Sequence, residues 1–264
     1  MKKLFALLLV LVMALGLFAA CGTTEPAGTT APKTDDPAGT TAPAEETLPE
    51  GVMTHAEYEA AAMDSQVTVH TYVQAVESWW DGKVQIYAQS KDGAYYIYNL
   101  ACTEEEAAKL VPGTKINIKG YKTFYKGMPE IAADGAVLTI LEGEDTFIAP
   151  AEILTDMLGK QELVNKAGAY AAFQGMTISK IEYRNGEPGD DIYVDLTLGD
   201  KTYSFCVERY LTDPETDVYK AFVNEDLKVG DVVNVYGFVY WYDADEDGQS
   251  GDGINTHITK ITKG

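Results

Sequence analysis

A strand motif that occurs twice, each time between two glycines, constrains the fold of this chain more than any other feature. Gly113 and Gly120 have the same spacing as Gly230 and Gly237. In both copies a glycine turn precedes alternating apolar and polar residues, and an aromatic residue follows the second glycine. Alternation with a period of two indicates a half-buried strand, and a glycine inside such a strand indicates a bulge or sharp bend. We therefore expect the same sharply bent strand at both copies of the motif.

The segments around the two copies repeat as well, which predicts two domains of one topology, at 51–147 and 150–264. Each half has the order strand, strand, strand, helix, strand, strand. We expect strands at 67–76, 84–89, 94–100, 111–125 and 131–141, then at 170–182, 192–198, 201–206, 231–242 and 254–262. The internal helices are expected at 103–110 and near 213–224. Further helices are expected from Thr54, which begins a capping-box pattern, and over 152–166.

This order resembles the OB-fold, a five-stranded Greek-key barrel with a helix between its third and fourth strands. The resemblance covers most of 65–141 and 169–262. The predicted fold class is mainly β: two tandem OB-fold-like five-stranded barrels with short helices, after a signal peptide and a disordered linker. The chain also resembles uncharacterised tandem OB-fold lipoproteins of Gram-positive anaerobic bacteria. Another small barrel, such as an SH3-like one, is the alternative, and the two internal helices argue against it.

The first 21 residues have the order of a secretory signal. Lys2 and Lys3 precede an uncharged apolar run over 4–20, which ends in two alanines directly before Cys21. This ending resembles the lipobox of bacterial lipoproteins, although Phe18 stands where that family usually has leucine. The resemblance implies that Cys21 is lipidated and holds the chain on the extracellular face of the cell membrane. A plain signal peptide and an uncleaved membrane helix are the alternatives, but the run is short for spanning, which takes roughly 20 apolar residues.

Residues 22–50 have the composition of a disordered tether. The sequence AGTTAP occurs at 27–32 and again at 38–43, and almost nothing in the segment is apolar. Such a segment cannot offset the entropy lost on ordering, so we expect an extended, solvated linker between anchor and barrels.

Acidic residues outnumber basic ones throughout the chain, which limits the kinds of partner that it can bind. There are 20 Lys and Arg against 41 Asp and Glu, a net charge of −21, and removal of the two signal lysines gives −23. We count 7 basic and 14 acidic residues in 51–147, and 10 and 20 in 155–264. Because non-specific nucleic-acid affinity depends on neutralising phosphates with Lys and Arg, this charge argues against nucleic acid as a partner.

Aromatic residues mark a candidate ligand face on the first barrel. OB barrels bind ligands across the second and third strands, between the loops that join strands one to two and four to five. The candidates in those places are Trp79, Trp80, Tyr87, Phe124, Tyr125 and Lys126. Two adjacent tryptophans on a short polar turn cannot both enter the core, so at least one should be exposed. Such aromatic shelves suit sugar rings or nucleobases, and packing of the barrel end is the alternative.

Lysines form a second pattern on the first barrel. They are Lys109, Lys115, Lys119, Lys122 and Lys126, interleaved with aromatic residues. A single nucleic-acid strand can be tracked by charge and stacking of this kind. The favoured interpretation is the solvated face of an edge strand, where lysine discourages aggregation.

An acidic loop in the second barrel matches the first half of a calcium-binding loop. Resemblance to EF-hand loops implies ligation by Asp243, Asp245, Asp247 and Gln249, and Asp252 could replace the closing glutamate, whose position holds Ile254. A solvated acidic loop without metal is the alternative. Calcium is the one candidate cofactor.

The sequence contains no recognisable catalytic constellation. Its three histidines are scattered. Cys102 and Cys206, which end apolar runs, are expected to be free buried thiols, with one bridge between the domains as the alternative. We therefore expect a non-enzymatic ligand-binding or interaction module on the cell surface. A glycan or other extracellular polymer is the favoured ligand, and a protein ligand is the other partner considered. The alternatives are an enzyme or enzyme accessory that acts on such a polymer, and single-stranded nucleic-acid binding by the first barrel.

Overall fold

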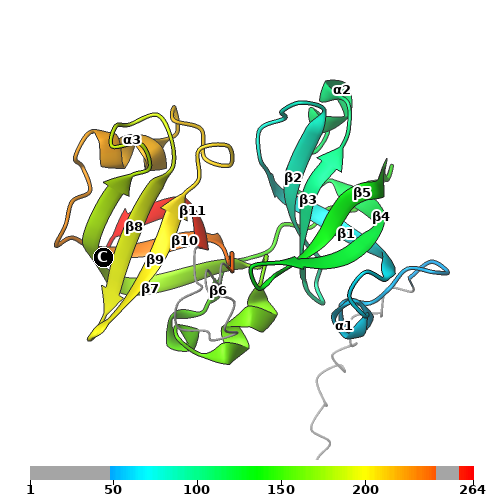
Figure 1. Ribbon diagram of the computed structural model, residues 1–264, viewed down its shortest axis with the longest axis horizontal. Helices are drawn as coiled ribbons and strands as arrows, with labels where there is room; N and C mark the ends of the chain where they lie inside the picture. Colours follow the sequence, from blue (N-terminus) through cyan, green and yellow to red (C-terminus); the bar gives the residue numbers. More distant parts are fainter. Residues whose placement is uncertain (1–47, 242–255) are drawn as a thin grey trace, which may run out of the picture. The chain divides into compact units, whose positions relative to one another are not determined.

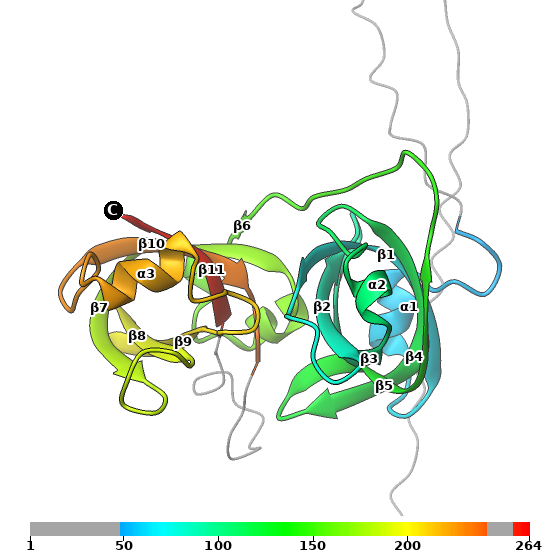
Figure 2. The same cartoon turned by 90° about the horizontal axis from the view of Figure 1, so that it is seen from above.

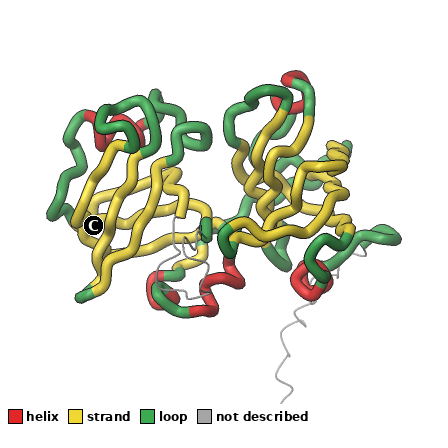
Figure 3. The backbone as a smooth tube through the Cα atoms, in the orientation of Figure 1, coloured by secondary structure: helices red, strands yellow, loops and turns green. Residues whose placement is uncertain are grey.

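Two barrels with one strand order make up most of the described chain, residues 48–241 and 256–264, in this computed structural model (Figure 1). Both barrels lie within one compact unit, 46–264. Strands predominate and helices are short, as Figure 3 shows. The predicted mainly β class with barrels and short helices is confirmed, and the predicted signal peptide and linker lie outside the described residues.

Barrel 1, residues 66–140, is a closed sheet with the order β1-β2-β3-β5-β4. Its elements are β1 (Gln66–Val76), β2 (Lys83–Gln89), β3 (Ala94–Ala101), α2 (Glu104–Ala107), β4 (Lys115–Tyr125) and β5 (Met128–Ile140). Pairing of β1 with β4 closes the ring, and β3 and β5 run parallel. This order, with a helix between the third and fourth strands, is that of an OB-fold-like barrel. Seen from above in Figure 2, the strands surround one interior.

Barrel 2, residues 170–263, repeats this arrangement. Its elements are β7 (Tyr170–Tyr183), β8 (Ile192–Leu198), β9 (Lys201–Val207), α3 (Asp217–Val223), β10 (Val232–Phe238) and β11 (Thr256–Lys263). The sheet order is β10-β11-β9-β8-β7, and β10 also pairs with β7. The third and fifth strands, β9 and β11, are again parallel. The short strand β6 (Glu152–Ile153) pairs with β7 outside the ring.

The paired glycines hold equivalent places in the two barrels. Gly113 and Gly230 precede the fourth strand with φ of +90° and +94°, a conformation that favours glycine. The strand register shifts next to Gly120 in barrel 1 and next to Gly237 in barrel 2. A Cβ on Gly237 would lie 2.0 Å from the carbonyl oxygen of His257, on the fifth strand. The predicted bend is therefore confirmed in both copies.

Strand alternation decides which residues of barrel 1 face its core. On β2, Val84, Ile86 and Ala88 are buried in the interior. Gln85, Tyr87 and Gln89 alternate with them and therefore point outward. On β3 the same rule places Tyr95 inside and Tyr96 outside, an assignment that the sequence left open. The outward positions of these two strands carry the site described below.

Helix α1 (His55–Ala60) begins at the predicted capping box, in which Thr54 and Glu57 bond reciprocally. Thr103 and Glu106 form the same motif at α2. The helix expected over 152–166 was wrong: this segment contains β6 and two 3-10 helices, η1 (Thr155–Met157) and η2 (Gln161–Lys166). Gly159, with a φ of +72°, separates them, which interrupts the helical path.

Cys102 and Cys206 are both free, as predicted. Cys206 is buried, as predicted, whereas the predicted burial was wrong for Cys102, which is only half-buried. Within 48–241 and 256–264, no helix has the length and apolar character needed to cross a membrane.

Candidate ligand-binding surface

The outer face of β2 and β3, where OB barrels take their ligands, is covered by barrel 2. The ring of Tyr87 stacks on that of Phe238, with centroids 4.4 Å apart and planes within 14°. The ring of Tyr96 meets that of Tyr240 edge-on at 5.5 Å. At one margin, the backbone N–H of Tyr170 donates to the side-chain oxygen of Gln89 at 3.0 Å. Tyr87 is fully buried by these contacts, so it does not lie on an open surface as the ligand-face prediction had it.

A neutral histidine belongs to this aromatic contact. The hydroxyl of Tyr87 and Nδ1 of His257 share a hydrogen bond of 2.8 Å. The ring of Tyr240 stacks on that of His257 at 4.5 Å. Complete burial lowers the pKa of His257 to about 3, so the imidazole is uncharged at neutral pH. The contact between the barrels is therefore aromatic and neutral at this point.

The two tryptophans of the β1–β2 turn remain at the surface. Trp79 is 38% exposed and Trp80 75%, which confirms that at least one faces solvent. Nε1 of Trp79 donates to the carbonyl oxygen of Cys102 at 3.0 Å, so this indole has a fixed orientation. The backbone groups of Trp80 and Lys83 bond reciprocally at 3.0 Å and close the turn. The turn therefore presents two large apolar rings on a hydrogen-bonded frame.

The other loop of the expected ligand face joins β4 to β5. Phe124 and Tyr125 are about half exposed at the end of β4. Lys126 and Gly127 form the turn, with φ of +48° and +83°. Of the six residues predicted for the ligand face, Tyr87 is the buried one; Trp79, Trp80 and Lys126 lie in the two loops, and Phe124 and Tyr125 end β4.

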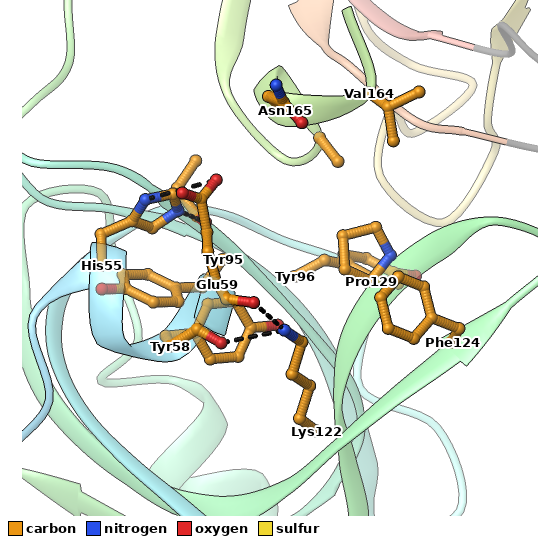
Figure 4. A pocket seen from close by; sticks show the side chains of 12 residues that line it. His55, Tyr58, Glu59, Tyr95, Tyr96, Lys122, Phe124, Pro129, Val164 and Asn165 are labelled. Carbon is orange, nitrogen blue, oxygen red and sulfur yellow. Dashed lines mark hydrogen bonds and ion pairs between the residues drawn. The ribbon is translucent and has the colours of Figure 1, made fainter. Parts of the chain in front are cut away.

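The lysine pattern does not form one continuous track, because Lys122 is buried. Its Nζ donates to the carbonyl oxygens of Tyr58, Glu59 and Ala61, at 2.9, 2.6 and 3.1 Å, and so caps the end of α1 (Figure 4). Lys122 has the same strand phase as the inward residues Ile116, Ile118 and Gly120, so alternation along β4 already contained this signal. Nζ of Lys115 lies 3.5 Å from a carboxylate oxygen of Asp145.

A pocket of about 260 Å³ opens beside this lysine (Figure 4). Its wall combines α1, β3, the β4–β5 hairpin and the η2 segment. The lining residues include His55, Tyr58, Tyr95, Phe124, Pro129 and Asn165. Sequence reasoning missed this pocket, because no local pattern connects residues so far apart in the chain.

Sequence reasoning also missed two buried carboxyl groups of barrel 1. Burial, and then the nearby carboxyls of Glu208 and Asp191, raise the pKa of Glu77 to about 8. Burial raises the pKa of Glu130 to about 7, and its Oε1 has no hydrogen-bond partner among the described residues. Both groups therefore retain a proton near neutral pH far more readily than an ordinary glutamate.

The predicted calcium loop, with Asp243, Asp245, Asp247, Gln249 and Asp252, lies outside the described residues. So do Cys21 and the tether. Within the ranges that are described, no group of three or more His, Cys, Asp or Glu side chains could hold a metal ion.

Comparison with known proteins shows similarity to solved structures alone. No family model matches the chain, and no curated protein matches its sequence. A murine DNA binding protein, solved with double-stranded DNA, is 12% identical with a TM-score of 0.36, over 75% of this chain and 98% of that one. An aspartyl tRNA synthetase from Entamoeba histolytica is 13% identical with a TM-score of 0.29, over 36% of this chain. A Leishmania major Friedlin protein assigned as an aspartyl-tRNA synthetase is 14% identical with a TM-score of 0.31, over 47% of this chain.

The chain spans about a fifth of the length of those two synthetases, 18% and 22%. At such identities and TM-scores the assignment to an OB-fold-like barrel rests on the strand order of this chain itself.

Proposed function

We propose that this protein is a non-enzymatic binding module whose ligand stacks on the exposed tryptophans of the β1–β2 turn. The observation that carries the proposal is the exposure of two adjacent indoles on a turn that hydrogen bonds hold in place. A fully solvated tryptophan forgoes the large gain of burying its ring, and aromatic side chains dominate the energetics of interfaces. A rigid turn that keeps both rings available is therefore suited to a planar or ring-shaped ligand.

The charge around the turn favours a neutral polymer, such as a glycan, over nucleic acid. Asp81 follows Trp80 directly. The bond from Trp79 to Cys102 brings its ring next to the start of α2, whose first turn contains Glu104, Glu105 and Glu106. A phosphodiester chain would meet these four carboxylates, and Lys83 is the one cation in the same turn, so the local charge disfavours the phosphates. A glycan offers apolar ring faces without that repulsion.

The proposal includes the cellular location. The signal-like order of the first 21 residues supports lipid anchoring at Cys21, and the Thr-rich and Pro-rich segment 22–50 would hold the barrels away from the membrane. Fractionation of cells that express the wild type or Cys21→Ala tests this location. Equal release of both proteins into the medium would contradict it.

The test of binding uses the full chain with cellohexaose, chitohexaose and maltohexaose, and a twelve-residue oligothymidylate as the nucleic-acid arm. Trp80→Ala should weaken sugar binding about tenfold, which corresponds to about 1.4 kcal/mol, while thermal stability stays nearly constant. Trp241→Phe is the matched control, because Trp241 is buried in barrel 2 and its change should leave sugar affinity unaltered. Binding of the oligothymidylate alone, at physiological salt, would contradict the proposal.

A further inference from the structure

The turn that carries the tryptophans is bonded to barrel 2. The backbone N–H of Ser78 donates to the carbonyl oxygen of Tyr210 at 2.7 Å, and the Ser78 hydroxyl donates to the same oxygen at 3.1 Å. Tyr210 lies between β9 and α3, and nearly half of it is exposed. The guanidinium of Arg209 lies 5.2 Å from the centre of its ring. Exposed aromatic residues of both barrels therefore occur at one hydrogen-bonded junction.

Glu77, the residue before Ser78, is 4% exposed. Its carboxyl group accepts a hydrogen bond from the side-chain amide of Gln85, whose oxygen in turn accepts from the Tyr96 hydroxyl at 2.8 Å. Among the described residues, no Lys, Arg or His forms an ion pair with Glu77. A charge on this buried carboxyl group would thus have no cation beside it, which is costly in free energy.

The groups that face Glu77 from barrel 2 are acidic. They are Glu208, which follows β9, and Asp191, which precedes β8. Asp191 is paired with the guanidinium of Arg184 at 2.8 Å, and Glu208 accepts from the backbone N–H of Leu211 at 2.7 Å. The other titratable groups near Glu77 are the hydroxyls of Tyr87, Tyr96 and Tyr240. Burial raises the pKa of each, and a charge on Glu77 raises it further. Ionisation of Glu77 would therefore place like charges against each other across the junction.

We propose that the stacking surface is composite, with Tyr210 of barrel 2 as its third ring, and that Glu77 is a carboxyl latch: the barrels dock when it is neutral and loosen when it is charged. The ligand part of this inference rests on the proposed function. The latch itself does not, because docking can be measured without any ligand.

The direction of the pH effect follows from proton linkage. The pKa of Glu77 is about 8 in the docked barrels, against an ordinary value of 4.5 for an exposed carboxyl group. Between these values the docked form binds more protons than the open form, so docking weakens as pH rises through this window and levels off above it. One such proton changes the opening equilibrium by up to about tenfold per pH unit. Burial also raises the pKa of Glu208, which acts in the same direction.

Small-angle X-ray scattering of the full chain between pH 5 and pH 9 measures the latch. The radius of gyration should increase above pH 7 in the wild type and increase much less in Glu77→Gln, whose amide cannot ionise and in which the Glu208 carboxyl group remains. Glu105→Gln, an exposed change of the same charge, should behave as wild type. If Glu77→Gln is poorly folded by circular dichroism, Ser78→Ala replaces it and should expand at lower pH than the wild type. A radius that does not change with pH in any of these proteins would overturn the latch.

Titration with the hexasaccharide that binds best tests the composite surface. We expect the Kd of the wild type to rise several-fold from pH 6 to pH 8.5, up to the value of Tyr210→Ala, and to rise less in Glu77→Gln. Tyr210→Ala should raise the Kd several-fold at pH 6. Equal affinity at both pH values and in Tyr210→Ala would overturn this inference but leave the proposed function standing. Expansion with pH and no sugar binding at all would overturn the proposed function but leave the latch.

Discussion

The outer faces of the second and third strands differ between the two barrels, although the strand order is the same. In barrel 1 this face carries Tyr87 and Tyr96, and barrel 2 covers it. In barrel 2 the corresponding face carries Tyr193, which is only half-buried, beside polar residues: the hydroxyl of the exposed Ser204 donates to a carboxylate oxygen of Asp195 at 2.8 Å. The strand order therefore decides where the outer face of the second and third strands lies, whereas the outward residues on that face decide whether another part of the protein covers it.

The reason is the different cost of removing each face from water. Outward tyrosine rings gain free energy when they are stacked and buried, provided that their hydroxyls keep a partner, as those of Tyr87 and Tyr96 do. Outward carboxylates and hydroxyls lose their hydrogen bonds to water on burial, and the hydrogen bonds that they form within the protein offset only part of that cost. The closed face of barrel 1 leaves its loops as the available surface.

Truncation of the buried ring should have the largest effect. Tyr87→Ala removes a ring stacked on Phe238 and the hydrogen bond to His257, which should lower the free energy of unfolding by about 3–5 kcal/mol. Tyr193→Ala is the matched change, since Tyr193 lies outward on β8 and is only half-buried, and should cost at most about 1 kcal/mol. Urea unfolding measures both. Equal losses would mean that the two faces do not differ in burial.

The bend glycines provide a smaller effect of the same kind in both barrels. A Cβ at Gly237 would meet backbone at 2.0 Å, whereas at Gly120 its nearest contact is the side chain of Ile131 at 2.7 Å. Overpacking typically costs about 1–3 kcal/mol, and Gly237→Ala should lie above Gly120→Ala because backbone moves less readily than a side chain. Thermal unfolding of the two variants should show this order, and the reverse order would contradict the closer backbone approach at Gly237.

Lys122 occupies a position at which the two barrels differ, so a substitution there tests how far their structural equivalence extends. The spacing from the bend glycine places Val239 in barrel 2 at the position of Lys122 in barrel 1. Lys122→Val should nevertheless destabilise the protein by about 1–3 kcal/mol, because carbonyl oxygens at the end of α1 lose their donor. Hydrogen exchange should locate the loss in 55–61. Lys119→Val, at an exposed position of the same strand, is the control and should change stability little.

At neutral pH the smallest effect is that of His257, which acts only as the pH falls. Its pKa is lowered in the folded protein, to about 3 from an ordinary 6.5, so the unfolded chain binds more protons between these values. Stability should therefore fall as pH decreases from 6.5 toward 3. His257→Gln should flatten this part of the profile in chemical unfolding between pH 4 and pH 7. A slope unchanged by the substitution would mean that the imidazole is accessible to protons when folded.

The strands, the bends and the exposed indoles were predictable because each depends on a local pattern. Alternation identifies strand faces, paired glycines identify the bends, and the polar flanks of Trp79 and Trp80 identify a turn. The burial of Lys122 was also predictable from the alternation of β4, but the spacing of the five lysines favoured a single exposed pattern instead. The closure of the ligand face was not predictable. It depends on Phe238, Tyr240 and His257 meeting Tyr87 across a long sequence separation, and periodicity describes one element at a time.

The most direct test of the account is hydroxyl-radical footprinting of the full chain at pH 6, with the oxidation of individual aromatic side chains quantified by mass spectrometry. We predict fast oxidation of Trp80, slower oxidation of Trp79 and Tyr210, and protection of Tyr87 and Tyr96 to the level of the core residue Trp241. Oxidation of Tyr87 and Tyr96 as fast as that of Trp80 would contradict the account, because the ligand face of barrel 1 would then be open.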